Sequence, residues 1–225
     1  MHSGKGQVVE LMLENGLRLA RIACPAELIP APGQYLLAGY ASDSPLPVSL
    51  FSTESNAGSF ISSPPIPESW IPGTELTLRG PLGRGFSLPD PARKIALVPF
   101  DSSSFHLRSL IRPALAQGAA IVLVNDVDWE RLPDEVEVQP FSALEDVLEW
   151  ADYIASDVAR ESLPGLRERL GVVTQLSGKK EAQALVRTPL PCGGVAECGV
   201  CAVTLKSGWK LACRDGPVFD LREIL

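Results

Sequence analysis

The sequence has no long hydrophobic run, no dense basic segment and no recognisable targeting signal. No segment of the 225-residue chain approaches the roughly 18 to 20 apolar residues of a membrane-spanning helix. Residues 1–13 lack both the charged start and the long apolar run of a secretory signal peptide. The net charge is −7, and no basic patch is dense enough for a nucleic-acid surface. We therefore expect a cytoplasmic protein with no membrane span and no nucleic-acid partner.

The sequence also has few groups suited to nucleophilic catalysis. It contains only two histidines, and His106 stands in an expected helix with no second metal ligand nearby. An exposed histidine, or one hydrogen-bonded within its helix, is the simpler interpretation. No Ser/His/Asp or Cys/His combination is apparent. The sequence therefore predicts no nucleophilic catalytic residues.

The residues that are present predict an α+β multidomain protein. Hydrophobic residues make up 45% and charged residues 21% of the chain, which suits a globular core. Residues 1–92 form short strands and turns, including an Asn15-Gly16 hairpin signal, and indicate an antiparallel β-barrel. Residues 93–180 alternate apolar strands with helices, as in α/β nucleotide-binding-like domains with a parallel sheet. Residues 181–225 form a small cysteine-rich module.

Four of the five cysteines fall in this module, with the spacing Cys192-x5-Cys198-x2-Cys201-x11-Cys213. Clustered cysteines in a reducing compartment are metal ligands or redox groups more often than disulfides. Glycines 193, 194 and 199 allow the positive-φ turns that aim backbone N–H groups at thiolates. Three ligands in a loop and a fourth outside it is the arrangement of ferredoxin-type [2Fe–2S] sites, although this loop is one residue longer. We therefore predict that these four cysteines bind a [2Fe–2S] cluster.

Two other interpretations of the cysteines stay open. Four thiolates can hold a structural zinc ion, but two C-x2-C pairs would be usual and only one is present. Disulfides are the remaining alternative, which the expected compartment disfavours. Cys24 lies far from the group in sequence and is expected to be a small buried hydrophobic residue. Trp209 is expected to shield the cluster or to pack within the module.

Three sequence patches resemble one family, the electron-transfer subunit of dihydroorotate dehydrogenase B. The segment CGGVAECGVCAV with the later CRDGPVFD resembles the iron–sulfur tail of that subunit. PGQYLL at residues 32–37 and GPLGRGF at residues 80–86 are similar to patches of its ferredoxin-reductase-like flavin domain. The order of barrel, α/β domain and cluster module also agrees, so the resemblance spans nearly the whole chain.

The resemblance implies an electron relay in pyrimidine biosynthesis. Family members bind FAD between the barrel and the α/β domain, accept hydride from NADH, and pass single electrons through the cluster to a flavoprotein catalytic subunit. It implies that this chain works in a hetero-oligomer, as a non-autonomous component of an oxidoreductase. Candidate flavin contacts carried over from the family patches are Ser49, Gly80, Gly83, Arg84 and Gly85.

The sequence departs from the family at both nucleotide sites. Where the family has R-x-[YF]-S, this chain has Leu46-Pro47-Val48-Ser49, and leucine cannot clamp a diphosphate. The glycine-rich turn expected after the first α/β strand is replaced by Asp101 and three serines. An ordinary helix start with Asp101 or Ser102 as the N-cap is the simpler interpretation. The family's later CGP turn is here Ala155-Ser156-Asp157.

The sequence therefore predicts a [2Fe–2S] electron-transfer subunit with its NAD(P)H site lost and with FAD binding left open. The alternative is a non-catalytic assembly or redox-sensing subunit on a retired reductase scaffold. Under that alternative the cluster serves structure or sensing, and the chain serves as a docking platform.

Overall fold

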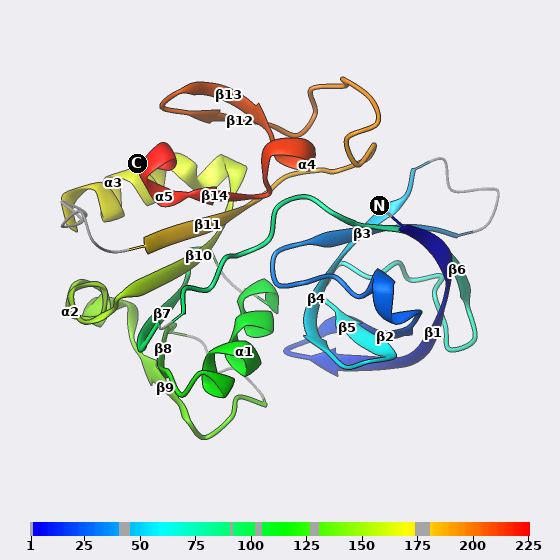
Figure 1. Ribbon diagram of the computed structural model, residues 1–225, viewed down its shortest axis with the longest axis horizontal. Helices are drawn as coiled ribbons and strands as arrows, with labels where there is room; N and C mark the ends of the chain where they lie inside the picture. Colours follow the sequence, from blue (N-terminus) through cyan, green and yellow to red (C-terminus); the bar gives the residue numbers. More distant parts are fainter. Residues whose placement is uncertain (1, 41–45, 91, 102–104, 127–130, 174–180) are drawn as a thin grey trace.

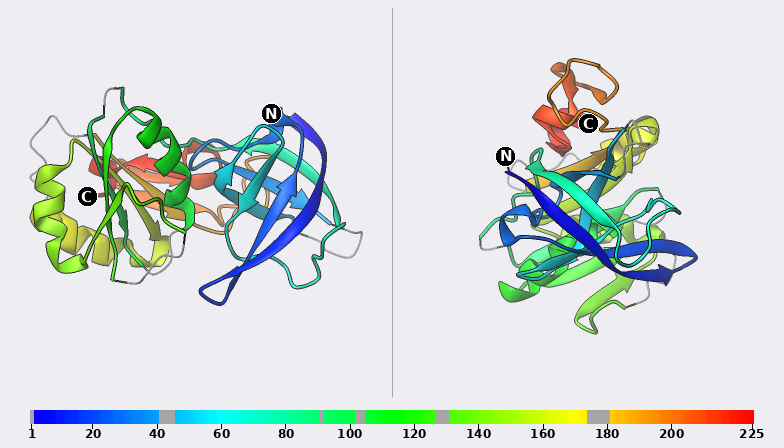
Figure 2. Two further views of the ribbon diagram at one scale, coloured as in Figure 1. Left: turned by 90° about the horizontal axis from the view of Figure 1, so that it is seen from below. Right: turned by 90° about the vertical axis from the view of Figure 1, so that its right-hand side faces the viewer.

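The computed structural model describes residues 2–40, 46–90, 92–101, 105–126, 131–173 and 181–225. The chain forms two lobes, a β-barrel and an α/β domain, with a small C-terminal module above their junction (Figure 1). Figure 2 shows from two further directions that the lobes are distinct and that the module lies on one side of the junction. No helix of the described residues is long and apolar enough to cross a membrane.

The amino-terminal lobe is a closed six-stranded barrel in the order β1-β2-β5-β4-β3-β6. The predicted hairpin turn is present, because Asn15 and Gly16 both have positive φ and join β1 to its antiparallel partner β2. Alternating apolar side chains fill the interior around the fully buried Trp70. The strands are β1 (His2–Glu14), β2 (Leu17–Ala23), β3 (Tyr35–Gly39), β4 (Val48–Ser55), β5 (Ser59–Ser62) and β6 (Glu75–Leu82), and the 3-10 helix η1 (Ala26–Leu28) precedes β3.

The α/β domain is built on a six-stranded sheet in the order β14-β11-β10-β7-β8-β9. Five strands are parallel, and the edge strand β14 is antiparallel to β11. The central strand β7 is almost continuously apolar because alternate side chains enter cores on the two faces of the sheet. The strands are β7 (Lys94–Pro99), β8 (Ala120–Val124), β9 (Val136–Gln139), β10 (Tyr153–Ala159), β11 (Glu181–Arg187) and β14 (Val218–Asp220).

Helices cover both faces of this sheet (Figure 1). The segment predicted as one helix after β7 begins as a 3-10 helix and continues as α1. Asp101 is not seen to act as its N-cap, because its carboxylate accepts the N–H of Ala159 instead, and Ser102 lies outside the described residues. The helices are η2 (Phe105–Leu110), α1 (Ile111–Ala116), η3 (Phe141–Ala143), α2 (Leu144–Trp150), η4 (Arg160–Ser162) and α3 (Leu163–Val173).

The division between the α/β domain and the C-terminal module differs from the predicted one at residue 180. Strand β11, which the sequence placed in the module, pairs in parallel with β10 along its whole length. The chain then leaves the sheet, forms the cysteine loop, and returns to the sheet edge as β14. The module elements are the hairpin of β12 (Ala202–Leu205) and β13 (Gly208–Leu211), with α4 (Ala212–Asp215) and α5 (Leu221–Ile224).

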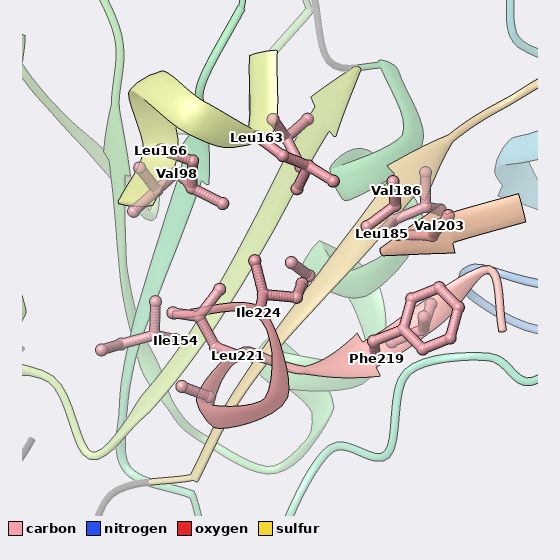
Figure 3. Close-up of a cluster of buried hydrophobic side chains, with 14 of the residues drawn as sticks. Val98, Ile154, Leu163, Leu166, Leu185, Val186, Val203, Phe219, Leu221 and Ile224 are labelled. Carbon is pink, nitrogen blue, oxygen red and sulfur yellow. The ribbon is translucent and has the colours of Figure 1, made fainter. Parts of the chain in front are cut away.

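The module shares a hydrophobic core with the α/β domain. Figure 3 shows Val203 of β12 beside Leu185 and Val186 of β11, and Leu221 of α5 beside Ile154 of β10. All five side chains are buried. The cysteine module is therefore packed onto the α/β domain by apolar contacts rather than attached through a linker.

Candidate metal centre

The four clustered cysteines lie in two pairs. Cys192 and Cys198 are in the loop before β12, where Cys198 is exposed, and their Sγ atoms are 3.8 Å apart. Cys201 at the end of the loop and Cys213 in α4 are buried, and their Sγ atoms are 3.2 Å apart. All these thiols are free, so the structure contradicts the disulfide alternative.

The loop that carries three of these cysteines turns at glycines. Gly193, Gly194 and Gly199 have φ values of +57°, +84° and +69°, as the sequence predicted. This conformation is rarely adopted by residues with a Cβ atom, so the loop needs glycine at these turns. Arg160 supports the far end of the loop by donating to the carbonyl of Val200 at 2.7 Å.

The two pairs have different electrostatic surroundings. Burial raises the pKa of the Cys213 thiol to about 12, and the neighbouring Cys201 adds to the effect. For Cys192, burial also acts to raise the pKa, but backbone hydrogen bonds at Ala196 and Gly194 outweigh it and hold the pKa below its usual value. The pair in the loop is therefore solvated and supported by backbone groups, whereas the inner pair sits in apolar surroundings.

The all-thiolate donor set fits an iron–sulfur cluster. Two thiolates on one tetrahedral metal with metal–sulfur bonds of about 2.3 Å lie about 3.8 Å apart. Cys192 and Cys198 have this spacing, and Cys201 and Cys213 are somewhat closer. In the part of the chain that the structure describes, no three Cys, His, Asp or Glu side chains are grouped as ligands of one ion. Two pairs side by side match a centre with two metal atoms.

The barrel supplies one wall of this site. The Arg79 guanidinium, on the outer face of β6, donates from Nη2 to the carbonyl oxygen of Cys192 at 2.6 Å. The hydroxyl of Tyr35, from β3, donates to the carbonyl of Cys213 at 3.4 Å. A Cβ atom on Gly193 would lie 2.7 Å from both Arg79 and Leu37. The cysteine loop thus lies directly against the barrel, and no local sequence pattern predicts this contact.

The predicted flavin-contact loop also faces the cysteine module. The N–H of Arg84 donates to the carbonyl of Gly216, while its exposed side chain extends elsewhere. A Cβ on Gly83, which has φ +73°, would lie 2.6 Å from Pro217. Gly85 approaches Pro32 closely, and Gly80 approaches Leu36. The three patches that carry the family resemblance therefore contact one another, and the backbone of Gly83 and Arg84 is engaged within the chain.

Ser49, the other predicted flavin contact, lies apart from that loop. It lines a cavity of about 400 Å³ between the barrel and the α/β domain. Phe51, Phe105 and the two adjacent prolines Pro64 and Pro65 give the cavity flat apolar walls. Thr188 also lines the cavity, and its buried hydroxyl oxygen has no hydrogen-bond partner among the described residues.

An ion network occupies the carboxyl ends of the parallel strands beside this cavity. Asp157, fully buried in β10, accepts from Nε of Arg187 at 2.7 Å and pairs with Nδ1 of His106 at 2.8 Å. Arg187 also pairs with Asp101 at 2.9 Å. Burial acts to raise the pKa of Asp157, but His106 and Arg187 outweigh it and hold that pKa below its usual value. His106 is therefore a buried residue hydrogen-bonded to a carboxylate on β10, not a surface one.

Other singled-out residues have simple structural roles. Cys24 is buried in the barrel core, and burial, with a contribution from Glu27, raises its pKa to about 11. This confirms its expected role as a small hydrophobic residue. Trp209 is 70% exposed on β13, so packing inside the module is contradicted.

Comparison with known families identifies the cysteine module. Residues 192–225 match the iron–sulfur cluster binding domain of dihydroorotate dehydrogenase B. The match covers all four clustered cysteines and confirms the resemblance predicted from the sequence. This part of the chain is therefore an iron–sulfur cluster binding domain.

Solved structures resemble the whole chain. A chain of the NADH-dependent reduced ferredoxin–NADP oxidoreductase, studied for flavin-based electron bifurcation, has a TM-score of 0.73 at 16% identity, covering 97% of this chain and 88% of that one. The ferredoxin reductase of carbazole 1,9a-dioxygenase has a TM-score of 0.62 at 14% identity, covering 81% and 68%. The FAD/NAD binding domain of nitric oxide dioxygenase from Vibrio cholerae O1 biovar El Tor has a TM-score of 0.58 at 12% identity, covering 83% of this chain and 100% of that one. The fold is ferredoxin-reductase-like, as predicted.

Proposed function

We propose that this chain, an iron–sulfur domain of the dihydroorotate dehydrogenase B family on a ferredoxin-reductase-like fold, is a non-autonomous electron-transfer subunit. It binds one [2Fe–2S] cluster through Cys192, Cys198, Cys201 and Cys213. It relays electrons to or from a flavoprotein partner, for which a dihydroorotate-oxidising subunit of pyrimidine biosynthesis is the candidate. The observation that carries the proposal is the arrangement of the four thiols in two adjacent pairs.

The chain's own residues give the site the two surroundings that a relay needs. When bound, a [2Fe–2S] cluster accepts and releases one electron at a time. Cys201 and Cys213 anchor it on the buried side, against the core shared with the α/β domain. Cys198 lies on the exposed side, where Val195 and Val200 are also exposed. A partner that covers this loop would therefore approach the cluster without any movement of the core.

The nucleotide edge of the α/β domain supports loss of the NAD(P)H site. In the strand order β9-β8-β7-β10-β11, the crevice for a nucleotide lies where the order reverses, between β7 and β10. Here that crevice holds the carboxylates of Asp101 and Asp157, bridged by Arg187. A pyrophosphate would meet two carboxylates, and the guanidinium of Arg187 between them is already paired with both.

The residues fit a flavin ring better than they fit FAD as a whole. The flat apolar walls of the interdomain cavity suit a planar ring. The family's diphosphate-clamping arginine is replaced by Leu46, which is 62% exposed. No step of the proposed relay depends on FAD in this chain.

A second candidate function is a docking or redox-sensing subunit. The observation that favours it is a buried ion pair between the lobes, in which Arg108 of the α/β domain donates to the carboxylate of Glu14 in the barrel. An ion pair that joins the two lobes suits a protein in which the crevice between them does not bind a nucleotide. The two candidates differ in whether the cluster exchanges electrons with a partner.

An absorption spectrum of anaerobically purified protein, with iron, sulfide and released-flavin assays, tests the proposal. We expect two irons and two sulfides per chain, as one [2Fe–2S] cluster requires, and absorption that bleaches on reduction. Zinc in place of iron would overturn the proposal. A cluster that accepts no electron from dithionite would favour the docking function. One flavin per chain would show that the cavity binds the cofactor without the arginine clamp.

A further inference from the structure

Arg79 of the barrel is placed to act on the cluster. It stands on the polar outer face of β6, in an alternating strand where the inward residues Leu76 and Leu78 are buried. From the sequence it would pass for a solvated surface charge. In the structure it is half-buried and donates to the carbonyl of Cys192.

The glycine turn of the cysteine loop brings the loop backbone onto this guanidinium. A Cβ on Gly193 would come within 2.7 Å of Nη2 of Arg79 and 2.8 Å of Leu82. With its positive φ, Gly193 is the residue that permits this approach. The cation is therefore held at the site by backbone shape as well as by its hydrogen bond.

The barrel also contacts the inner side of the site. The hydroxyl of Tyr35 donates to the carbonyl of Cys213 at 3.4 Å, so residues of β3 and β6 reach the backbone of one cysteine from each pair. No carboxylate pairs with Arg79 among the described residues, so its charge is not cancelled by a near neighbour.

We propose that Arg79 is a positioning residue that sets the reduction potential of the cluster from the barrel. One-electron reduction adds one negative charge to the cluster and its four thiolates, with no bond made or broken. A nearby cation stabilises that charge and raises the potential. The inference rests on the proposed function, because it requires a cluster on these cysteines.

The test is an EPR-monitored potentiometric titration with dithionite on native protein and on Arg79→Gln, Arg79→Lys and Arg21→Gln. Arg21 is the control, since it lies on β2, across the closed barrel from β3, and pairs with Glu10. We expect Arg79→Gln to lower the equilibrium constant for reduction by up to about tenfold, which is about 59 mV for one electron. Arg79→Lys and Arg21→Gln should stay close to native.

A native potential in Arg79→Gln with a full cluster would overturn the inference, as would Arg79→Lys falling as far as Arg79→Gln. If Arg79→Gln fails to retain the cluster, Thr77→Glu provides the test. Thr77 is exposed on the same face of β6 and Lys5 donates to it, so this variant is made together with Lys5→Gln to place an unpaired carboxylate near the guanidinium. An unchanged potential in Thr77→Glu would then count against the inference. Absence of iron and sulfide from native protein would instead refute the proposed function.

Discussion

The barrel meets the rest of the chain along two junctions built from different chemistry. Toward the cysteine module the closest approaches are at glycines, where Gly33 meets Val218 and Gly83 meets Pro217, and Arg79 adds one hydrogen bond to the loop backbone. Toward the α/β domain the contact is made by charged and aromatic side chains, with Phe51 edge-on to His106 at 4.9 Å. This second junction also encloses a cavity of about 400 Å³.

The difference between the two junctions reflects two structural requirements, one for binding a cluster and one for binding a nucleotide. A cluster loop must be held by tightly fitted backbone, because the geometry of its thiolates depends on it. A nucleotide crevice must instead offer unpaired N–H groups and cations, and here the corresponding positions are filled by an internal ion network. The chain therefore combines four clustered thiols, which we propose as the cluster ligands, with a crevice whose carboxylates are already paired with Arg187.

The largest expected effect is on the cluster itself. Cys201→Ser replaces a buried inner ligand, and we expect the visible absorption and half or more of the bound iron to be lost, because thiolate ligands hold such clusters. Cys24→Ser is the matched control, since that cysteine lies in the barrel core away from the module. The two variants are compared by absorption and iron analysis after anaerobic purification, and an unchanged spectrum in Cys201→Ser would refute the ligand assignment.

The second prediction removes the centre of the ion network beside the interdomain cavity. Asp157→Asn leaves Arg187 and His106 without their buried carboxylate, and we expect the free energy of unfolding at pH 7 to fall by about 3–5 kcal/mol. The measurement is urea denaturation followed by circular dichroism. The cluster should persist under native conditions, because the network lies within the α/β domain and, among the described residues, makes no hydrogen bond to the cysteine loop. A loss below about 0.5 kcal/mol would mean that the network does not stabilise the α/β domain.

The same comparison has a defined pH dependence. The pKa of Asp157 is lower in the folded chain than its usual value of about 3.9, so the folded state binds fewer protons at this group. The stabilisation that the ionised Asp157 gives the folded state is present above pH 4 and is lost as the pH falls through the pKa of the folded state. The stability gap between native protein and Asp157→Asn should therefore stay constant from pH 7 to about pH 5 and narrow below pH 4. A gap that widened in acid would contradict the assignment.

Much of the fold could be predicted from local sequence patterns. The features that could not be predicted share one cause, which is that they depend on residues far apart in the sequence. Period-two patterns, Asn15-Gly16 and the apolar β7 depend on nearby residues, so the barrel and the parallel sheet could be predicted. Arg79 and His106 could not be placed, because each occupies an ordinary surface pattern and finds its partner across more than 50 residues. The assignment of β11 failed for a similar reason, since β14 returns to pair with it only after the cysteine loop.

The patches that resemble the family illustrate the same limit. Gly83 and Arg84 were predicted to contact a flavin because their sequence motif indicates a tight backbone turn. The motif does not indicate which residues pack against that turn, and here they include Pro217 and Gly216. The flavin role of these residues stays a prediction, whereas their fit to the cysteine module can be tested directly.

The smallest predicted effect tests that fit. Gly83 and Gly16 both have φ near +75°, so alanine at either position carries a similar backbone penalty of about 1–2 kcal/mol. At Gly16 nothing lies within 4 Å of the added methyl, whereas at Gly83 it would lie 2.6 Å from Pro217 and 2.7 Å from the carbonyl of Gly216. Gly83→Ala should therefore lose about 1–3 kcal/mol more than Gly16→Ala in urea denaturation. It should also release iron faster, because the strain falls on the segment that carries Cys213. An equal decrease in the free energy of unfolding in the two variants would mean that the backbone contact between the module and the barrel at Gly83 does not contribute to stability.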